Sequence, residues 1–266
     1  MIPVILQETE ENKMATACIT GASSGIGREF ARQLSNRGFD LILVARSGDK
    51  LKEVAAKCNT KSEVFVCDLS RREECERLLS HLSGKEIAFF VNNAGFGNIG
   101  LFEENDLDRD LEMINVNVRA MHILAHGMLR QMKKRDRGYL LNVASVAGLM
   151  PGGPLMATYY ATKAYVASLT SSIAEELAYQ GSRVKAFALC PGPVDTEFND
   201  VAGVKFSLPG ISARNCVQAC LKGMQKGTTV IVPGFTVNAL QKLSSFVPRK
   251  LLMKILMKGQ TKKLEK

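Results

Sequence analysis

The sequence lacks a long apolar run and a recognisable leader. It has no stretch of about 18 uninterrupted apolar residues, the length that a helix needs to cross a bilayer, so we expect no membrane-spanning helix. The apolar start, Met1–Leu6, is too short for a signal peptide and has no basic region. We therefore expect a cytoplasmic protein whose native start is Met1 or Met14.

The sequence also lacks the patterns of disulfide-stabilised and zinc-binding proteins. Its seven cysteines are odd in number and include no CxxC pair. Cys216 and Cys220 lie four residues apart, but no pair of histidines at ligand spacing accompanies them. We expect reduced thiols and no metal site.

No linker, repeat or low-complexity block separates Ala15 from Pro233. Hydrophobic residues make up 46% of the 266 residues and charged residues 23%, which is typical of a globular protein rather than a disordered one. We predict one catalytic domain over residues 15–233. A disordered extension, residues 1–14, precedes it, and a basic amphipathic extension, residues 234–266, follows and packs on the same domain.

Positive charge is in excess, but it is unevenly distributed. The sequence has 35 Lys and Arg against 26 Asp and Glu, a net charge of +9. From Lys242 onward, eight cations against Glu265 give 8 − 1 = +7, so the first 241 residues carry only 9 − 7 = +2. The cations are not interleaved with aromatic residues and no nucleic-acid-binding motif occurs, so we expect no nucleic-acid partner.

Short apolar runs alternate with helix-length amphipathic stretches along the chain. Continuously apolar strands are typical of a parallel sheet that is buried on both faces. The alternation predicts a Rossmann-type doubly wound α/β fold: a seven-stranded parallel sheet with helices on both faces. The expected strands are Ala15–Thr20, Asp40–Ala45, Glu63–Cys67, Ala88–Val91, Tyr139–Ala144, Val184–Leu189 and Thr229–Val232.

A glycine-rich turn, Thr20–Gly27, follows the first expected strand and opens the first expected helix. Gly21 permits a tight turn, Gly25 lets the backbone approach a pyrophosphate, and Gly27 lets the helix pack on the sheet. The free N–H groups at the helix start favour bound phosphate. The turn predicts a dinucleotide site, and the alternative is a purely structural turn.

The end of the second strand indicates which dinucleotide binds. NAD sites usually have an acidic residue there, whereas this strand ends in Arg46, which can bind a 2′-phosphate. We therefore expect NADP(H) rather than NAD(H), unless Arg46 is only a solvated surface residue. Asp68, before Leu69, either accepts a hydrogen bond from the adenine amino group or caps the following helix.

Tyr159 and Lys163 are four residues apart and share one face of an expected helix. An ammonium group beside a phenol, together with a positively charged nicotinamide, favours the phenolate and lowers the phenol pKa. Ser145 ends the fifth expected strand. Tyr160 is one residue off the Lys163 face, and we expect it to pack against the core or a partner helix.

With these motifs the sequence resembles the short-chain dehydrogenase/reductase superfamily, in its compact form, from about Ala15 to Val232. Thr20–Gly27 matches the family's TGxxxGxG motif, and Asn92–Gly95 matches its NNAG motif. Pro191–Thr196 matches the segment that holds the nicotinamide carboxamide. The cofactor-binding residues that this resemblance implies are Gly21, Ser23, Ser24, Gly25, Ile26, Gly27, Arg46, Asp68, Leu69, Asn93, Ala94, Gly95, Tyr159, Lys163, Pro191, Gly192, Val194 and Thr196.

The resemblance also implies a catalytic set of Ser145, Tyr159, Lys163 and an asparagine in the helix after the fourth strand. Asn115 and Asn117 are both candidates, and their flanking valines align best with Asn117. In such a site Tyr159 exchanges a proton with the substrate oxygen during hydride transfer. Ser145 orients that oxygen, Lys163 holds the nicotinamide ribose, and Asn117 anchors a water. The alternative function is an NADP-sensing regulatory protein on the same fold.

The expected substrate wall is Phe96, Leu149–Met156 and the loop Pro193–Pro209, which is apolar through Phe198, Val201, Val204, Phe206 and Leu208. A 3-oxoacyl thioester or a steroid fits such a wall better than a sugar, and the alternative is ordinary core and lid packing. The family implies a homodimer or homotetramer through the helices expected at Asp108–Arg135 and Tyr159–Gln180.

In the extension, apolar residues alternate with lysine at helical spacing over Val247–Lys258, and we expect the helical region Phe235–Lys258 to break near Pro248. This pattern predicts contact with an anionic membrane or an acidic carrier protein. The alternative is a helix that caps the substrate pocket or a partner subunit.

Overall fold

The computed structural model describes residues 15–198, 203 and 210–264, with side chains as far as Thr261. The predicted extension 1–14 lies outside these residues, as do Val201, Val204, Phe206 and Leu208 of the predicted substrate wall.

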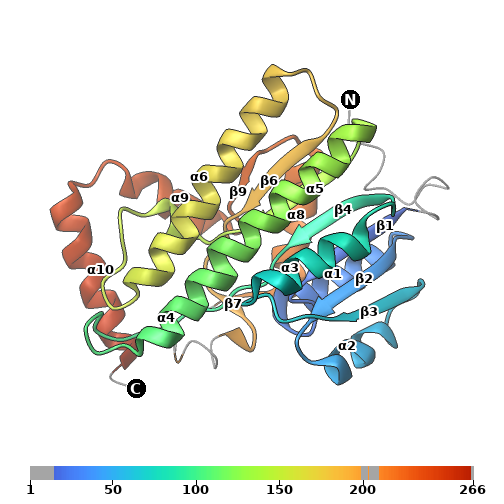
Figure 1. The fold of residues 1–266 in the computed structure, drawn as a ribbon. Coiled ribbons are helices and arrows are strands. Elements are labelled where there is room, and N and C mark those ends of the chain that lie inside the picture. Colours follow the sequence, from blue (N-terminus) through green and yellow to red (C-terminus); the bar gives the residue numbers. More distant parts are fainter. Residues whose placement is uncertain (1–14, 199–202, 204–209, 265–266) are drawn as a thin grey trace.

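The main sheet has seven strands in the order β3-β2-β1-β4-β5-β6-β9, and every neighbouring pair is parallel, which confirms the predicted sheet (Figure 1). The strand order reverses between β1 and β4, and such a switch point opens a crevice at the carboxyl ends of the strands. The strands are β1 (Thr16–Thr20), β2 (Asp40–Ala45), β3 (Ser62–Val66), β4 (Ile87–Asn92), β5 (Tyr139–Val143), β6 (Lys185–Leu189) and β9 (Val230–Ile231).

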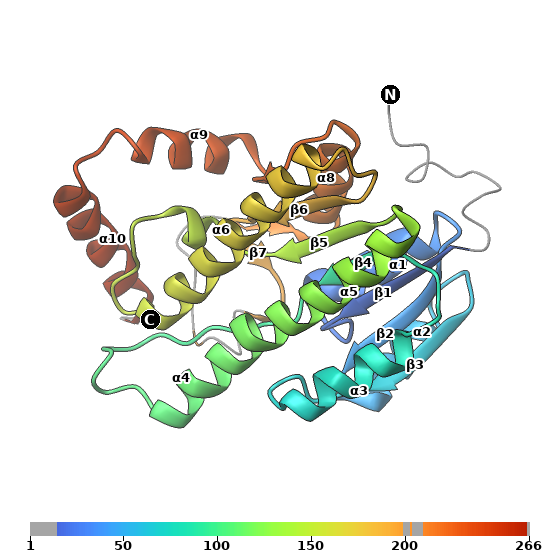
Figure 2. The same cartoon turned by 45° about the horizontal axis from the view of Figure 1, so that its top comes forward.

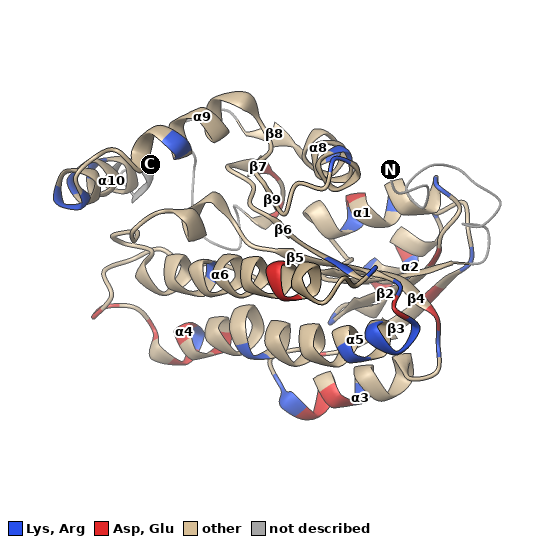
Figure 3. Ribbon diagram, turned by 90° about the horizontal axis from the view of Figure 1, so that it is seen from above, with Lys and Arg blue, Asp and Glu red and all other residues tan. Residues whose placement is uncertain are grey.

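Helices cover both faces of the sheet, with α1, α2 and α8 on one side and α3, α5 and α6 on the other (Figure 3). Each face has its own apolar core, and every residue of the central strands β4 and β5 is buried between them. This arrangement explains why these strands are apolar except for one buried asparagine each, Asn92 and Asn142. The helices are α1 (Gly25–Ser35), α2 (Gly48–Ala55), α3 (Arg72–Leu82), α5 (Met121–Arg135), α6 (Ala157–Tyr179) and α8 (Ala213–Gln225).

The single helix predicted over Asp108–Arg135 is three consecutive segments in the structure. α4 (Leu107–Ile114) leads into the π-helical segment η3 (Asn115–Ala120), which continues as α5. A π-helical segment inserts one residue per turn and rotates the side chains that follow it, and apolar periodicity does not reveal this. Sequence analysis also did not predict the 3₁₀ turn η4 (Val146–Leu149) or the small parallel pair β7 (Val194–Asp195) and β8 (Ile211–Ser212).

Two helices of the C-terminal extension lie at one end of the molecule, beyond the edge of the sheet (Figures 1 and 2). α9 (Phe235–Ser244) and α10 (Arg249–Leu264) flank the break predicted near Pro248. The Arg249 guanidinium donates to the carbonyl oxygen of Pro151 at 3.2 Å. Met253 lies so close to Gly152 that a Cβ on this glycine would be 3.3 Å from the Met253 methyl group. The extension therefore covers the segment before α6.

Within residues 15–198, 203 and 210–264, no helix combines the length and apolar character that crossing a bilayer requires. The same residues contain no group of three or more His, Cys, Asp or Glu side chains placed to hold a metal ion. All seven cysteines are free thiols.

Candidate active site

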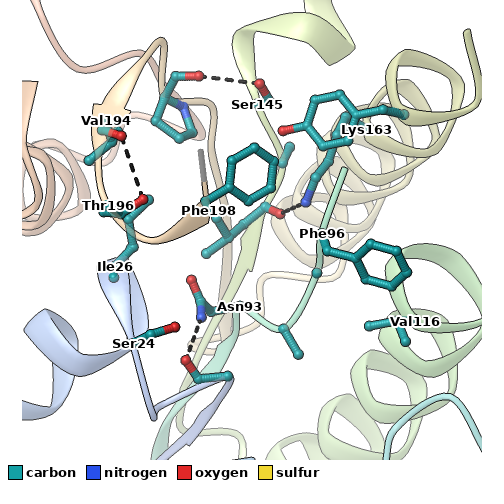
Figure 4. A pocket seen from close by; sticks show the side chains of 18 of the residues that line it. Ser24, Ile26, Asn93, Phe96, Val116, Ser145, Lys163, Val194, Thr196 and Phe198 are labelled. Carbon is teal, nitrogen blue, oxygen red and sulfur yellow. Dashed lines mark hydrogen bonds between the residues drawn. The ribbon is translucent and has the colours of Figure 1, made fainter. Parts of the chain in front are cut away.

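A cleft of about 340 Å³ opens at the carboxyl ends of the strands, where the strand order reverses (Figure 4). In Figure 4, Ser24 and Asn93 lie at one end of the cleft, Ser145 and Lys163 at the other, and Thr196 and Phe198 between them. Among the predicted site residues, all but Gly27 and Asn117 line the cleft. The structure thus gathers residues from widely separated parts of the sequence into one site.

The glycine turn is joined to the end of β4 by hydrogen bonds. The Thr20 hydroxyl accepts from the backbone N–H groups of Asn93 and Ala94 at 2.9 and 3.0 Å, and the Asn93 amide donates to the Thr20 carbonyl at 2.9 Å. A Cβ at Gly27 would lie 2.1 Å from the carbonyl oxygen of Gly21, so no other residue fits there. Gly27 therefore acts through packing, while Gly21 and Gly25 line the cleft.

An anionic group already lies at the start of α1. The Glu197 carboxylate accepts from the Gly25 N–H at 3.1 Å and pairs with the Arg28 guanidinium at 2.8 Å. Burial opposes ionisation of Glu197, but its own backbone N–H, Arg28 and the Gly25 N–H together hold its pKa below the usual value. The helix start thus attracts negative charge, which fits a dinucleotide pyrophosphate. Sequence analysis did not identify Glu197, because only the folded loop brings it to α1.

Arg46 lies in the cleft wall beyond β2, at the position expected of a phosphate-binding cation. Its guanidinium pairs with the Glu112 carboxylate of α4 at 3.0 Å, and about two-thirds of the Arg46 side chain is exposed. Sequence analysis missed Glu112, since no motif joins it to Arg46. Arg46 remains accessible to a phosphate group in this ion pair. The Glu112 carboxylate would compete with that phosphate for the guanidinium.

Asp68 lines the cleft after β3. Its carboxylate accepts from the Ser70 N–H at 3.0 Å, which closes a local turn. α3 starts later, and its N-cap residue is Arg71, without a side-chain cap. The alternative prediction that Asp68 caps this helix is therefore wrong. The position of Asp68 in the cleft wall is compatible with the other alternative, a hydrogen bond to the adenine amino group.

Ser145 and Tyr159 line the same part of the cleft. The Ser145 hydroxyl lies 3.4 Å from the Pro191 carbonyl oxygen and accepts from the Ala147 N–H at 3.2 Å. Burial raises the pKa of Tyr159, near the start of α6, to about 12, and the nearby Ser145 side chain opposes this only in part. The lowering of the Tyr159 pKa predicted from the sequence also depends on a positively charged nicotinamide, and it stays a prediction.

Lys163 lies one helical turn after Tyr159, as predicted, but its ammonium group does not contact the phenol oxygen. Lys163 Nζ donates to the Val143 carbonyl at 2.9 Å and lies 5.9 Å from the centre of the Tyr159 ring. Burial lowers the pKa of Lys163 to about 8. The distance and the bond to Val143 explain why Lys163 does not offset the burial of Tyr159.

Asn117 is held beneath the cleft by the π-helical segment. Its side chain accepts from the Phe96 N–H at 3.1 Å and donates to the Phe96 carbonyl at 2.9 Å and the Thr162 hydroxyl at 3.1 Å. A Cβ at Gly95 would lie 2.8 Å from the Asn117 oxygen and 3.3 Å from Lys163 Nζ, so both side chains flank Gly95. Asn117 is buried and Asn115 only partly so, which favours Asn117 of the two candidates.

The end of the cleft beside Tyr159 is apolar. Phe96, Met156 and Phe198 line it, as predicted. The centres of the Tyr159 and Phe198 rings are 5.7 Å apart. Leu149 instead packs against the core and Met150 contacts Ser244 of α9, and of the predicted stretch Leu149–Met156 the cleft lining includes Met156. Tyr160 also lines the cleft, and its hydroxyl accepts from Gln260 of α10.

This fold and this site define a Rossmann-type oxidoreductase that uses a nicotinamide dinucleotide and acts on carbonyl or alcohol groups. Residues 15–204 match the sequence family described as short chain dehydrogenase, and the chain belongs to that family.

Known proteins are similar over most of the chain. The very-long-chain 3-oxoacyl-CoA reductase of Rattus norvegicus is 32% identical over 252 residues, which cover 91% of this chain and 78% of that protein. The structure of a short-chain dehydrogenase from Sphingobium yanoikuyae in complex with NADPH is 30% identical, with a TM-score of 0.78 and coverage of 88% and 97%. The bulky-bulky ketone specific alcohol dehydrogenase from Comamonas testosteroni is 26% identical, with a TM-score of 0.72 and coverage of 88% and 95%.

Proposed function

We propose that the protein is an NADPH-dependent carbonyl reductase that converts a bulky hydrophobic ketone, such as a 3-oxoacyl thioester or a steroid, into a secondary alcohol. The observation that carries the proposal is the grouping of Ser145, Tyr159 and Lys163 at the apolar end of one cleft. A phenol in this position can supply the proton that carbonyl reduction requires, and the reductase activity named for the rat relative supports this direction.

Each residue of the catalytic set has a defined task in this proposal. Tyr159 Oη donates its proton to the carbonyl oxygen, and Ser145 Oγ holds that oxygen by a hydrogen bond. Lys163, held by the Val143 carbonyl, faces the cleft as a cation that binds ribose hydroxyl groups. Asn117 fixes Gly95 and Phe96 in place and positions a water near Lys163. A bound nicotinamide supplies the hydride.

The choice of NADPH rests on Arg46. This guanidinium is exposed at the cleft beyond β2, where it can form charge-assisted hydrogen bonds to a 2′-phosphate. The complex of the Sphingobium yanoikuyae relative with NADPH supports this choice. The apolar cleft end and the substrates named for the rat and Comamonas testosteroni relatives support a bulky apolar ketone.

The decisive experiment measures the oxidation of NADPH and of NADH with a panel of 3-oxoacyl thioesters, steroid ketones and small diketones. The proposal expects turnover with NADPH and an apolar ketone, and slower turnover with NADH. Binding of NADPH without turnover of any ketone would favour the cofactor-sensing alternative instead.

For the assembly, a homodimer or homotetramer through α4, α5 and α6 remains our proposal. The α4 side chains of Leu107, Leu111 and Ile114 are exposed in the single chain, and burying them in a partner interface is favourable. Light scattering during size-exclusion chromatography gives the mass of the assembly, and a monomer at micromolar concentration would contradict this proposal.

A further inference from the structure

The outer side of α9 and α10 exposes large apolar side chains at one end of the molecule. Phe235, at the start of α9, is 91% exposed, and Phe246, in the turn between α9 and α10, is 85% exposed. The other exposed apolar side chains on these helices are Leu240, Leu243, Leu251, Ile255 and Met257. Soluble monomers rarely leave such a group of side chains in water without a partner.

This apolar surface carries positive charge without any opposing charge in its own sequence. From Phe235 to Leu264 the sequence contains no Asp or Glu. Figure 3 shows blue segments and no red ones on α9 and α10. The exposed cations with described side chains are Lys242, Arg249, Lys250, Lys254 and Lys258.

The exposed apolar groups are not left over from incomplete packing, because the same helix satisfies its core contacts on its other side. Leu252 and Gln260 are buried against the body of the protein, and Met253 packs on Gly152. On the outer side of α10, Leu251 and Ile255 alternate with lysines whose long stems can lie along an apolar surface while the ammonium groups stay in water.

We propose that the outer side of α9 and α10 docks the protein onto the surface of an anionic lipid bilayer. Helices that carry phenylalanine and leucine among lysines, with no acidic residue, bind in the headgroup region through apolar burial and attraction to anionic lipid. In this position the apolar end of the cleft, which α10 reaches through the contact of Gln260 with Tyr160, lies near the membrane.

Two other occupants fit this surface less well. In a symmetric dimer through this surface, the five described cations of one copy would face the five of the other. Repulsion between these like charges disfavours such a dimer. An acidic peptide helix docks into an apolar groove, whereas these two helices stand out from the end of the protein (Figure 2). A flat anionic surface is the partner that accepts both the charge and the protruding shape.

The test is co-sedimentation of the full-length protein with vesicles of phosphatidylcholine alone and of equal parts phosphatidylcholine and phosphatidylglycerol. We expect sedimentation with the anionic vesicles only, weakened by added salt. The double variant K250E/K254E should lower the partition coefficient by at least about thirtyfold, because two surface cations are lost and two anions replace them. The matched control K57E/K61E makes the same charge change at two exposed positions elsewhere and should lose far less.

The apolar contribution is tested separately. L243S/F246S should also reduce vesicle binding at least about tenfold, since two apolar side chains no longer enter the headgroup region. The control Y179S removes an exposed aromatic ring at the last residue of α6, and it should leave vesicle binding unchanged. Turnover of a soluble diketone and circular dichroism should be unchanged in every variant, which shows that each one is folded.

Three results would overturn the proposal. One is equal sedimentation with both kinds of vesicle, and another is an equal effect of K250E/K254E and K57E/K61E. The third is a wild-type protein that does not bind vesicles but forms an oligomer, together with dissociation of that oligomer by L243S/F246S. This result would show that the surface binds a second copy of the chain. Because vesicle binding needs no turnover, the outcome is independent of whether the proposed reductase activity is found.

Discussion

Gln260 of the C-terminal helix donates a hydrogen bond from its amide nitrogen to the hydroxyl of Tyr160, at 3.0 Å. Both residues are mostly buried, and Tyr160 directly follows the proposed catalytic acid Tyr159. The bond therefore joins α10, which is remote in sequence, to the wall of the cleft.

Replacement of Gln260 by leucine should loosen this wall without destroying the site. We expect KM for a bulky ketone to rise severalfold, because Tyr160 loses its buried partner, while kcat/KM for a small diketone stays unchanged. Steady-state kinetics with both substrates check this. Thr261→Ala, which removes only hydrogen bonds within α10, is the control and should alter neither value.

Replacement of Tyr159 by phenylalanine removes the proposed acid and leaves the ring in place. Turnover should fall by about 10²–10⁴-fold, the range usual for loss of a general acid. The dissociation constant for NADPH, measured by fluorescence, should change little. Tyr160→Phe keeps a phenol at position 159 and should retain most activity toward a small diketone, so comparable losses of that activity in the two variants would contradict the assignment.

Buried Lys163 should leave a signature in the pH dependence of stability. Its folded pKa is about 8, below its ordinary value of 10.5, so between these values only the unfolded chain binds the proton. The contribution of Lys163 to the free energy of unfolding therefore rises with pH across that interval and is unfavourable below it. Lys163→Met lacks this titration. The stability difference, wild type minus variant, should increase from pH 8 to 10.5, and a flat difference would show that Lys163 is not desolvated.

Arg46 and Glu112 should set the preference between the two dinucleotides. Arg46→Ala is expected to weaken NADPH binding by about 10–100-fold, the value of a charge-assisted hydrogen bond, and to leave NADH binding unchanged. Glu112→Gln removes the competing carboxylate of an exposed ion pair and should tighten NADPH binding by up to about fivefold. Calorimetric titration with each dinucleotide measures both effects. Lys57→Ala serves as a control for lost surface charge.

Gly27→Ala tests the close contact under the glycine turn. The added methyl would meet the Gly21 carbonyl oxygen, so we expect a loss of about 1–3 kcal/mol in the free energy of unfolding and much weaker NADPH binding. Gly259→Ala in α10 adds the same methyl group where no atom lies within 4 Å, and it should stabilise the protein by up to about 1 kcal/mol. Urea unfolding curves compare the two variants.

Much of the fold could be predicted from local pattern. The apolar runs that became β1, β2, β4, β5 and β6 reveal their burial directly, because a strand covered on both faces is mostly apolar. The glycine turn and the pair Tyr159 and Lys163 could likewise be identified. Each is a local motif, in which the number of residues between its members fixes how they lie in space.

Contacts between distant segments could not be predicted in this way. The pairs Arg46–Glu112 and Arg28–Glu197, and the hydrogen bond between Gln260 and Tyr160, join residues that no motif connects. The π-helical turn that carries Asn117 inward is also invisible to apolar periodicity.

The sequence by itself determined the layered α/β architecture, because its alternating apolar runs and amphipathic stretches dictate it, and it predicted the dinucleotide turn and the catalytic side chains through motifs that resemble a known family. Only the tertiary structure decided that Tyr159 is buried, which raises its pKa, and that Lys163 Nζ lies 5.9 Å from the centre of its ring, since both depend on packing. Packing also decided that one side of the basic C-terminal segment faces the protein beside the cleft and that the other side is left exposed.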